Sequence, residues 1–347
     1  MPRRAASRPD PVPGLDLEQI RTQIADVITE FFATKTGPLA DVLTDAVGGG
    51  KLMRPVLCTV GWHAARGPRA DESALRLGAS LELYHAYLLI HDDVFDNADT
   101  RRGRPALHRR LDSQHPGAGT TLAIAAGDVL ACWHHELADT APLSPAQALR
   151  LGPVMARMRR EVVQGQYHEL LLTQHGRPDD LAQVLDIARA KSGNYSVTWP
   201  LVIGATAATA DSATATALRH YGTPLGEAFQ LRDDLLGVFG DEQVTGKPVG
   251  DDLREGKPTA LMALAWAAAG PEQHSILRAH VGRSDATAAE IAECQDIITD
   301  LGVPERVEAL IADRYQQAMQ ALEQAPVTAP ARTTLRHLAA QLAYRDT

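Results

Sequence analysis

Apolar residues recur at helical spacing along almost the whole of this 347-residue chain. The pattern continues from Leu15 to the C-terminus, and we find no alternating run of apolar and polar residues of the kind that forms strands. Neither a repeat of solenoid period nor a change of composition marks a second domain. We therefore predict an all-α fold, a single large helical bundle. The first of these patterns consists of Leu17, Ile20, Ile24, Val27, Ile28 and Phe31.

The same spacing predicts where the helices lie. After the first one at 17–31, we expect helices at residues 55–65, 72–95, 120–140, 145–173, 181–195, 214–239, 259–269, 286–301, 304–324 and 331–345. Ser144 before Pro145 is a predicted N-cap, as are Asp71 and Asp180. Residues 1–14 contain four prolines and three arginines and are predicted to be a disordered tail. The all-α domain would then cover residues 15–347.

The composition excludes several classes of function. The net charge of −9 argues against nucleic-acid binding, so a site for an anionic substrate would need metal ions or a local basic group. The three cysteines are odd in number and unpaired in spacing, which favours a reduced cytoplasm. The N-terminus lacks an apolar signal core, and the longest apolar stretch, residues 197–210, is interrupted by Pro200. We therefore expect a cytoplasmic protein without a membrane span.

Two aspartate pairs stand in otherwise apolar, helix-patterned segments, where an unpaired carboxylate is costly to bury. The first aspartate motif is Asp92, Asp93 and Asp96, in the sequence DDVFD. Asp92 and Asp96 are four residues apart and so share a helix face, on which they can hold one cation together. Oxygen ligands at this density suit magnesium, which binds through one or two carboxylates plus substrate phosphates. A solvated acidic helix end is the alternative.

The second aspartate motif is Asp233 and Asp234, in the sequence DDLLG. Its apolar neighbours favour a position at a pocket wall, although a paired surface carboxylate is the alternative. Gly237 stands where a third aspartate would repeat the spacing of the first motif, and Gly240 argues against a helix that continues to Asp241. Two facing motifs of this kind would hold several divalent ions, and several ions imply a polyphosphate between them.

Basic residues recur beside glycines. Lys51 and Arg54 follow three glycines at a predicted helix entry, where backbone amides also attract anions. Arg101 and Arg102 follow the first aspartate motif, and the planar fork of arginine suits phosphate oxygens. Two lysines lie in a loop after the second motif, where a solvated loop of mixed charge is the alternative: Lys247 and Lys257.

Five blocks of the sequence resemble the signature regions of the trans-isoprenyl diphosphate synthases, in the same order and at similar spacing. They are GGGKLMRP, HAYLLIHDDVFDNADTRRGRP, KSGNY, FQLRDDLLGVFGD and VTGKPVGDDLREGKPT. The resemblance runs from about Leu15 to the C-terminus. It implies a helical bundle around a central cavity, of the isoprenoid synthase type, and commonly a homodimer.

The resemblance implies a magnesium-dependent prenyltransferase. An allylic diphosphate (dimethylallyl, geranyl or farnesyl) ionises, its carbocation alkylates isopentenyl diphosphate, and the released diphosphate takes the proton. Asp92 and Asp96 would bind two magnesium ions and Asp233 a third, with Asp93 and Asp234 as further candidate ligands.

Other residues match family positions that bind the substrates. Those that contact the allylic diphosphate are Arg101, Lys191, Lys247 and Lys257. Those that hold isopentenyl diphosphate without metal are Lys51, Arg54, His85 and Arg102. Ser192 and Gln230 match positions whose oxygens face the carbocation. The residues expected to act in catalysis are Asp92, Asp96, Asp233, Arg101, Lys191, Ser192 and Gln230.

The chain departs from the family pattern at two positions. Gly237 replaces the usual last aspartate of the second motif, and Ser192 stands where threonine is frequent. Because Asp233 is the principal ligand of that motif in the family, we expect catalysis to survive with an altered metal affinity.

Product length depends on the floor of the cavity. Tyr87 lies five residues before Asp92, about 7.5 Å down a helix, and Leu88 is a non-aromatic residue at the fourth position. In the family a large residue there stops the growing chain, and this pattern resembles synthases that make geranylgeranyl diphosphate. Farnesyl diphosphate is the alternative, bulk at Tyr84 would move the floor, and plain core packing would explain the same residues.

Two other functions fit part of the pattern. A class I terpene cyclase shares an aspartate-rich motif and a helical fold, but it needs a different second metal site and no second diphosphate site at Lys51 and Arg54. A catalytically weak subunit of a heteromeric synthase would lose an aspartate motif or basic positions, and Gly237 is the one such sign.

Overall fold

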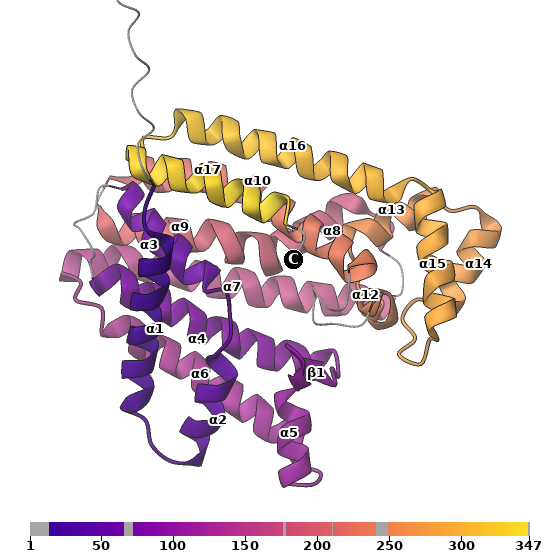
Figure 1. The fold of residues 1–347 in the computed structure, drawn as a ribbon, viewed down its shortest axis with the longest axis horizontal. Coiled ribbons are helices and arrows are strands. Elements are labelled where there is room, and N and C mark those ends of the chain that lie inside the picture. The colour runs from indigo at the N-terminus through magenta and orange to yellow at the C-terminus, as the bar shows by residue number, and fades with distance from the viewer. Residues whose placement is uncertain (1–13, 66–71, 176–177, 210, 241–248, 346–347) are drawn as a thin grey trace, which may run out of the picture.

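The computed structural model describes residues 14–65, 72–175, 178–209, 211–240 and 249–345. Within these ranges the chain is almost entirely helical, which confirms the predicted all-α class (Figure 1). The one sheet in this described part is a hairpin of two short strands, β1 (Thr100–Arg101) and β2 (Arg104–Pro105). None of its helices is both long and apolar enough to cross a membrane.

The first half of the chain forms the helices around the first aspartate motif. They are α1 (Leu17–Ala33), α2 (Pro38–Val47), α3 (Met53–Ala64), α4 (Glu72–Phe95), α5 (Leu107–Gln114), α6 (Gly119–Asp139) and α7 (Pro145–His175). α4 packs against α1, α3 and α6, and it ends at Phe95, inside the motif.

The second half supplies the rest of the bundle. Its elements are α8 (Leu181–Ala188), the π-helix η1 (Arg189–Thr198), α9 (Trp199–Ala208), α10 (Ser212–Phe239), α12 (Asp251–Glu255), α13 (Ala260–Ala268), α14 (Pro271–His280), α15 (Ala288–Asp300), α16 (Val303–Gln324) and α17 (Ala329–Ala343). α10 packs against η1, α9 and α16 and carries the second aspartate motif near its C-terminal end.

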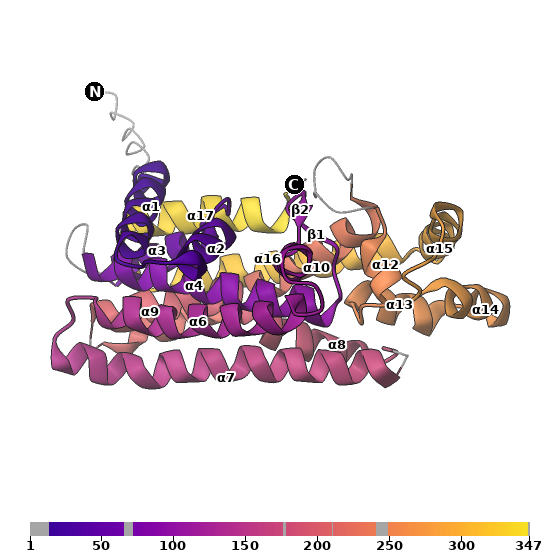
Figure 2. The ribbon, with the colours of Figure 1, turned by 90° about the horizontal axis from the view of Figure 1, so that it is seen from below.

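The helices are stacked in layers, as Figure 2 shows from the side. α7 lies along one face, α4, α6, α9 and α10 form the middle, and α1, α2, α3 and α17 cover the opposite face. α13, α14 and α15 extend from one end of the stack (Figures 1 and 2). α17 ends near the middle of the long axis (Figure 1), and Arg345 after it pairs with Asp233 of α10.

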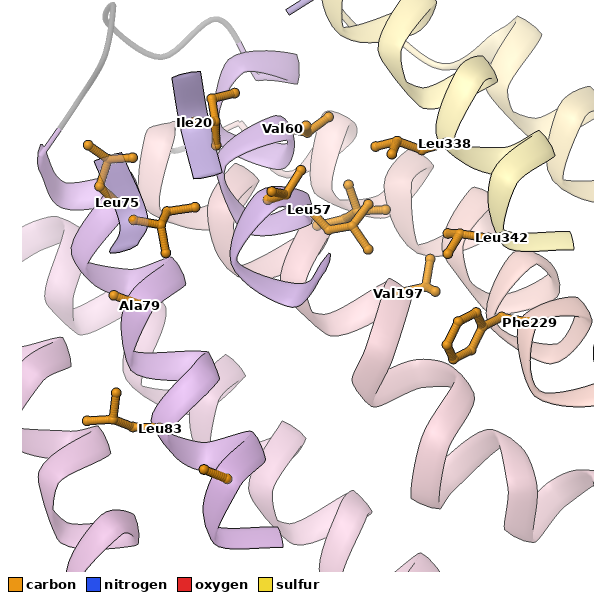
Figure 3. Close-up of a cluster of buried hydrophobic side chains, with 14 of the residues drawn as sticks. Ile20, Leu57, Val60, Leu75, Ala79, Leu83, Val197, Phe229, Leu338 and Leu342 are labelled. Atoms are coloured by element: carbon orange, nitrogen blue, oxygen red, sulfur yellow. The ribbon is translucent and has the colours of Figure 1, made fainter. Parts of the chain in front are cut away.

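The main hydrophobic core joins both halves of the chain. Figure 3 shows side chains from α1, α3, α4, η1, α10 and α17 turned toward one another, among them Ile20, Leu57, Leu83, Val197, Phe229 and Leu338. Burial of such apolar surface is what stabilises helices of this length, since isolated helices are marginal in water. Leu15 is already fixed to this body, because its amide donates a 2.8 Å hydrogen bond to Thr334 Oγ1.

We propose that residues 15–347 form one domain, as the sequence predicted. α10 is the reason: Tyr221 and Leu225 belong to the main core, while Leu231 and Leu235 on the same helix belong to a second core with α13, α15 and α16. One continuous helix thus links both cores. The predicted disordered tail lies outside the described residues, apart from Gly14.

Helix positions predicted from the sequence are confirmed to within two residues at each end, with one exception. The helix expected at 181–195 ends at Ala188 and gives way to the wider turns of η1. Asp180 caps α8 as predicted, accepting hydrogen bonds from the amides of Ala182 and Gln183, and Ser144 accepts one from the Gln147 amide. Asp71 lies outside the described residues.

Sequence reasoning did not predict six elements of the described chain: α2, α5, α9, α12, α14 and the hairpin. The five helices are ten residues or shorter. α2, α5, α12 and α14 have three buried positions or fewer to define a period, whereas α9 is buried almost throughout and so has no distinct apolar face. Such short helices depend on tertiary contacts for their stability.

Candidate active site

A cavity of about 500 Å³ opens where the ends of several helices meet. α4, η1 and α10 contribute six of the polar residues in its wall, α7 and α12 add carboxylates, and the segment after α17 adds Arg345. The cavity brings together residues that lie far apart in the sequence. The predicted site residues that line it are Lys51, Asp92, Arg101, Lys191, Ser192, Gln230, Asp233, Asp234 and Lys257.

The first aspartate motif lies where α4 ends. The Asp96 amide donates a 2.8 Å hydrogen bond to the Asp92 carbonyl oxygen, so the helical turn continues past Phe95. Asp92 and Asp96 therefore share a face. Each meets a lysine from another element: Lys191 Nζ lies 3.1 Å from Asp92 Oδ1, and Lys257 Nζ lies 3.5 Å from Asp96 Oδ2.

The two carboxylates of this pair bind protons differently. Burial would raise the pKa of Asp92, but the charges of Lys191, Lys257 and Arg101 hold it below its usual value. Burial, together with the charge of Asp92, raises the pKa of Asp96 to about 6. A cation placed between them would relieve this repulsion and favour the ionised form of both.

Asp93 lies on a different side of α4. Its side chain is buried and accepts a 2.8 Å hydrogen bond from Arg101 Nε, while Arg101 Nη2 lies 3.9 Å from Asp92 Oδ2. Asp93 lines a separate cavity of about 900 Å³ whose wall does not include Asp92. The structure thus makes Asp93 the anchor of Arg101 and does not place it with the pair that it was predicted to join as a metal ligand.

The β1–β2 hairpin sends consecutive arginines to different places. Its turn residues, Arg102 and Gly103, both have positive φ, 54° and 72°, as in the tight two-residue turns that join antiparallel strands. Arg101 lies beside the first aspartate motif. Arg102 instead donates a 2.8 Å hydrogen bond from Nη1 to the Gly48 carbonyl oxygen, in the glycine-rich loop before α3.

Lys191 and Lys257 are held in the cavity by carboxylates that sequence reasoning missed. Glu169, from α7, forms an ion pair with Lys191, and Glu255, next to Gly256, forms one with Lys257. Burial disfavours both charged ammonium groups, but these carboxylates and the nearby aspartates raise the pKa of each lysine above its usual value. Both lysines therefore remain cationic at neutral pH. Glu169 is a single glutamate on a long amphipathic helix, and its sequence context does not indicate a role in the site.

The second aspartate motif is asymmetric. Asp233 is 40% exposed and forms an ion pair with Arg345, whose guanidinium also lies 4.2 Å from the centre of the Phe229 ring. Asp234 is buried and accepts hydrogen bonds from Gln230 Nε2 at 2.9 Å and from the Ala260 amide at 3.3 Å. Burial raises the pKa of Asp234 to about 7. Asp233 is therefore the carboxylate of this motif that is open to a ligand.

Ser192 and Gln230 face the same cavity because η1 and α10 cross closely. A methyl group at Gly193 would lie 2.9 Å from the Gly226 backbone, and one at Gly226 would lie 2.3 Å from the Gly193 carbonyl oxygen. Only glycine permits this approach. Gln230 Nε2 donates its hydrogen bond to Asp234. The side-chain carbonyl oxygen of Gln230 is then the atom of this amide that can accept a hydrogen bond.

The basic group predicted for the second diphosphate surrounds a buried carboxylate. Glu82, from α4, is buried, and the charges of Arg54 and Arg102 oppose the rise in its pKa that burial causes. A side chain at Gly50 would meet Glu82 Oε1 at 2.7 Å and Arg102 Nη2 at 3.3 Å, so the glycine-rich loop lies directly on them. Sequence reasoning missed Glu82, which reads as an isolated charge in an apolar helix.

Arg54 and His85 belong to this basic group. Arg54 donates a 2.7 Å hydrogen bond from Nη2 to Ser196 Oγ, and its guanidinium lies 4.7 Å from the centre of the Tyr195 ring. Burial and the charges of Arg54, Arg102 and Arg101 hold the pKa of His85 well below its usual value. His85 is therefore neutral at pH 7 and offers one N–H donor.

Tyr87, which was predicted to stop chain growth, belongs to an aromatic group on α4 in the turns before the first aspartate motif. Tyr87 is partly buried, with its ring centre 5.2 Å from that of Tyr84 and 4.7 Å from that of His91. Tyr84 is fully buried and also contacts Tyr195 of η1, at 5.9 Å between ring centres. Leu88 packs against the buried hydrophobic cluster that contains Tyr84 and Tyr195. Tyr84 thus faces the interior between α4 and η1, one turn deeper than Leu88.

The donor set of the cavity fits magnesium. Asp92 and Asp233 line it with carboxylate oxygens, the ligands that this ion prefers. Asp96 is not part of the cavity wall, but its carboxylate lies 3.5 Å from Nζ of Lys257, a residue that is. In the part of the chain that the structure describes, no group of three or more acidic, histidine or cysteine side chains lies close enough to hold a metal unaided. Lys191 and Lys257 lie against these carboxylates, and substrate oxygens would complete the coordination. Lys247, which was predicted to contact the allylic diphosphate, lies outside the described residues.

Comparisons with known proteins match this arrangement. The polyprenyl synthetase family matches residues 37–298. The geranylfarnesyl diphosphate synthase of Aeropyrum pernix is 34% identical over 80% of this chain and 84% of that protein. The geranylgeranyl diphosphate synthase of Sulfolobus acidocaldarius is 30% identical over 88% of this chain and 90% of that protein.

Solved structures show the same fold. The geranylgeranyl pyrophosphate synthase of Corynebacterium glutamicum, complexed with isoprenyl diphosphate and magnesium, superposes with a TM-score of 0.91. It is 34% identical in sequence, and the match covers 95% of this chain and all of that one. The family match spans most of the chain and includes both aspartate motifs, and the cavity brings those motifs together. This chain belongs to the polyprenyl synthetase family.

Proposed function

We propose that this chain is a magnesium-dependent trans-prenyltransferase that joins an allylic diphosphate to isopentenyl diphosphate, with geranylgeranyl diphosphate as its product. One observation carries the proposal. The ends of α4, η1 and α10 gather carboxylates and lysines around one cavity, while Arg54, His85 and Arg102 form a basic group around Glu82 beside it. Two differently built anion sites suit two diphosphate substrates.

The residues of the cavity have distinct roles in this reaction. Magnesium, when bound, neutralises the negative charge that builds on the leaving diphosphate as its C–O bond breaks. Lys191, Lys257 and Arg101 donate to the same oxygens, and their acidic partners keep them charged and in place. The carbonyl oxygen of Gln230 and the hydroxyl of Ser192 would face the allylic cation.

The second substrate is held differently. Arg54 and Arg102 bind the diphosphate of isopentenyl diphosphate directly, and neutral His85 donates one hydrogen bond. Lys51, in the glycine-rich loop before α3, lines the 500 Å³ cavity. The released diphosphate takes the proton, so no side-chain base is required.

We propose three magnesium ions for each site, two on Asp92 and Asp96 and one on Asp233. We further propose a homodimer, because α6 exposes Leu122 and Ile124, apolar side chains suited to a contact with a second copy. Light scattering on the purified protein measures its mass. A cytoplasmic location remains a proposal, supported by the free thiols of Cys58, Cys132 and Cys294.

A condensation assay tests the function. The purified chain is incubated with magnesium, isopentenyl diphosphate and each allylic diphosphate in turn, and the dephosphorylated product is separated by chromatography. We expect geranylgeraniol, and no product when magnesium is chelated. Farnesol as the end product would support the alternative, a farnesyl diphosphate synthase. Absence of any condensation would leave a catalytically weak subunit, for which the missing side chain at Gly237 is the specific sign.

A further inference from the structure

The π-helix η1 contacts residues of both proposed diphosphate sites. Lys191 and Ser192, near its start, line the 500 Å³ cavity. One turn later, Tyr195 and Ser196 contact Arg54, which belongs to the basic group of the second site. A single helical element thus reaches from one site to the other.

The wide turns of η1 make this reach possible. A π-helix closes its hydrogen bonds between residues five apart, so a residue five positions on returns to nearly the same side. In an α-helix, with about 3.6 residues per turn, that residue would point about 140° away. Ser196 is five residues after Lys191. The π-turns therefore let Lys191 meet Asp92 of α4 while Ser196 meets Arg54 of α3, which packs against α4.

Ser196 is buried, and its hydroxyl holds Arg54. The residue is only 1% exposed, and its Oγ accepts a 2.7 Å hydrogen bond from Arg54 Nη2. Burying a hydroxyl is costly unless it is hydrogen-bonded, so packing alone does not favour a serine here. Alanine would fill the position without that cost. The contact with the guanidinium therefore explains the serine.

The Tyr195 ring holds the same guanidinium from a second direction. Its centre lies 4.7 Å from Arg54 Cζ, a distance at which a cation is attracted to an aromatic face. The ring is itself fixed, because Tyr195 is buried against Tyr84 and His85 of α4, at 5.9 and 6.2 Å between ring centres. Arg54 thus has two contacts from η1, one through a hydroxyl and one through a ring.

These contacts leave part of the Arg54 guanidinium for a ligand. Its Nε is buried and has no hydrogen-bond partner among the residues that the structure describes. An unpaired buried N–H is costly, and a diphosphate oxygen would satisfy it. Because the guanidinium is planar, fixing Nη2 and one face of the group also fixes the direction in which Nε points.

We propose that Ser196 and Tyr195 are positioning residues, which hold Arg54 in the orientation that binds the diphosphate of isopentenyl diphosphate. The inference rests on the proposed function, since it assigns two further residues to the second substrate site. Both act through Arg54 and not on the substrate itself. Because η1 also carries Lys191 and Ser192, the same element sets the second diphosphate in place relative to the first.

Steady-state kinetics with each substrate varied in turn test the assignment. We expect Ser196→Ala to raise the KM for isopentenyl diphosphate about 10-fold, because a hydrogen bond to a charged group is lost. The KM for the allylic diphosphate and kcat should stay within about two-fold of wild type. Tyr195→Leu removes the ring and should raise the same KM about 3-fold. Calorimetric titration of isopentenyl diphosphate with a chelator present measures the same losses as affinities.

A double-mutant cycle shows whether Ser196 acts through Arg54. In an Arg54→Ala protein, Ser196→Ala should raise the KM no further, since the guanidinium that it holds is absent. Ser80→Ala is the matched control, because it removes another buried serine hydroxyl, which donates to the Leu77 carbonyl oxygen within α4. This control should keep both KM values of wild type. The thermal midpoint of each variant checks that it is folded.

Three results would contradict specific parts. If wild type condenses the substrates and both single variants keep its KM for isopentenyl diphosphate, the assignment is wrong while the proposed function stands. An equal rise in both KM values, or a further rise when Ser196→Ala is added to Arg54→Ala, would show a general disturbance of the fold and would also overturn it. A wild-type protein without condensation activity would overturn the proposed function itself. Should one single variant fail to fold, the other carries the same test.

Discussion

Helices α4 and α10 each bring an aspartate pair to the same cavity, but they hold it in different ways. On α4 the ligand pair Asp92 and Asp96 comes from one helical turn, and Asp93, the residue after Asp92, turns away to anchor Arg101. On α10 only Asp233 is open, because Asp234 is buried against Gln230 and the start of α13. The ligands of the first motif are positioned by one helix, whereas the second motif is shaped by residues of neighbouring elements.

This contrast predicts unequal sensitivity to mutation. The largest effect is expected for Asp92→Asn, which removes a charge that contacts Lys191 and lies beside Asp96. Turnover should fall about 10²–10³-fold, because the negative charge that develops on the leaving diphosphate would lose a magnesium ligand that is already in place. Steady-state rates at saturating magnesium measure the loss, and circular dichroism checks the fold. A rate within a few-fold of wild type would contradict the metal role of Asp92.

The matching change on α10 should cost less. We expect Asp233→Asn to lower turnover about 10–100-fold and to raise the magnesium concentration needed for half-maximal rate. The exposed position of Asp233, and the pairing of its carboxylate with Arg345, leave other groups able to share its role. A loss larger than that of Asp92→Asn would reverse the ranking of the two motifs.

Proton binding should distinguish the motifs in the metal-free protein. Folding raises the pKa of Asp234 to about 7 from an ordinary 3.8, so the folded chain binds this proton more tightly than the unfolded chain does. The stabilisation is present at low pH and is lost as pH rises through 7, and Asp96, raised to about 6, adds to it. The part of the unfolding free energy that comes from these two carboxyls should thus fall by about 1–3 kcal/mol between about pH 5 and pH 8. Because the lowered pKa values of His85 and His134 contribute with the opposite sign, the Asp234 part is measured in urea with a chelator as the difference between wild type and Asp234→Asn.

Asp234→Asn is the control for this effect. The amide cannot ionise, so the unfolding free energy of wild type relative to this variant should decrease as pH rises through 7. Asp92→Asn should leave the Asp234 contribution in place and reduce only that of Asp96, because it removes a charge that helps to raise the pKa of Asp96. An unchanged pH dependence in Asp234→Asn would show that its carboxylate is not the buried proton acceptor.

The smallest effect on rate is expected for the α4 residues that were predicted to limit product length. Their effect on the length of the product should nevertheless be clear. Tyr87→Ala should lengthen the product by removing the ring predicted to stop the chain, while α10 variants should leave product length unchanged. Chromatography of the dephosphorylated products measures this. The structure adds Tyr84 as a second candidate, since its ring lies deeper and contacts Tyr195.

Tyr84→Leu distinguishes the two candidates, with Tyr84→Phe as the matched control that keeps the ring. Longer product from Tyr84→Leu alone would place the floor at Tyr84. An unchanged product from both Tyr87→Ala and Tyr84→Leu would mean that other side chains stop the chain.

Much of the fold could be read from the sequence. Long helices such as α4 and α16 were predicted to within two residues, because their apolar residues follow one period over many turns. Short elements were not, and neither was the π-helix η1, whose wide turns pack Gly193 against Gly226 of a helix 33 residues away in sequence. A contact between distant segments leaves no local period to detect.

The sequence by itself determined the all-α class, the two aspartate motifs and the basic blocks, since residue type and spacing along one helix suffice for these. Only the tertiary structure decided which groups face each other: Glu169 against Lys191, and Glu82 between Arg54 and Arg102. Each of these charges is isolated in the sequence and acquires its role from a segment that folding brings within a few ångströms. Burial and pairing energies depend on that distance, and spacing along the chain does not encode it.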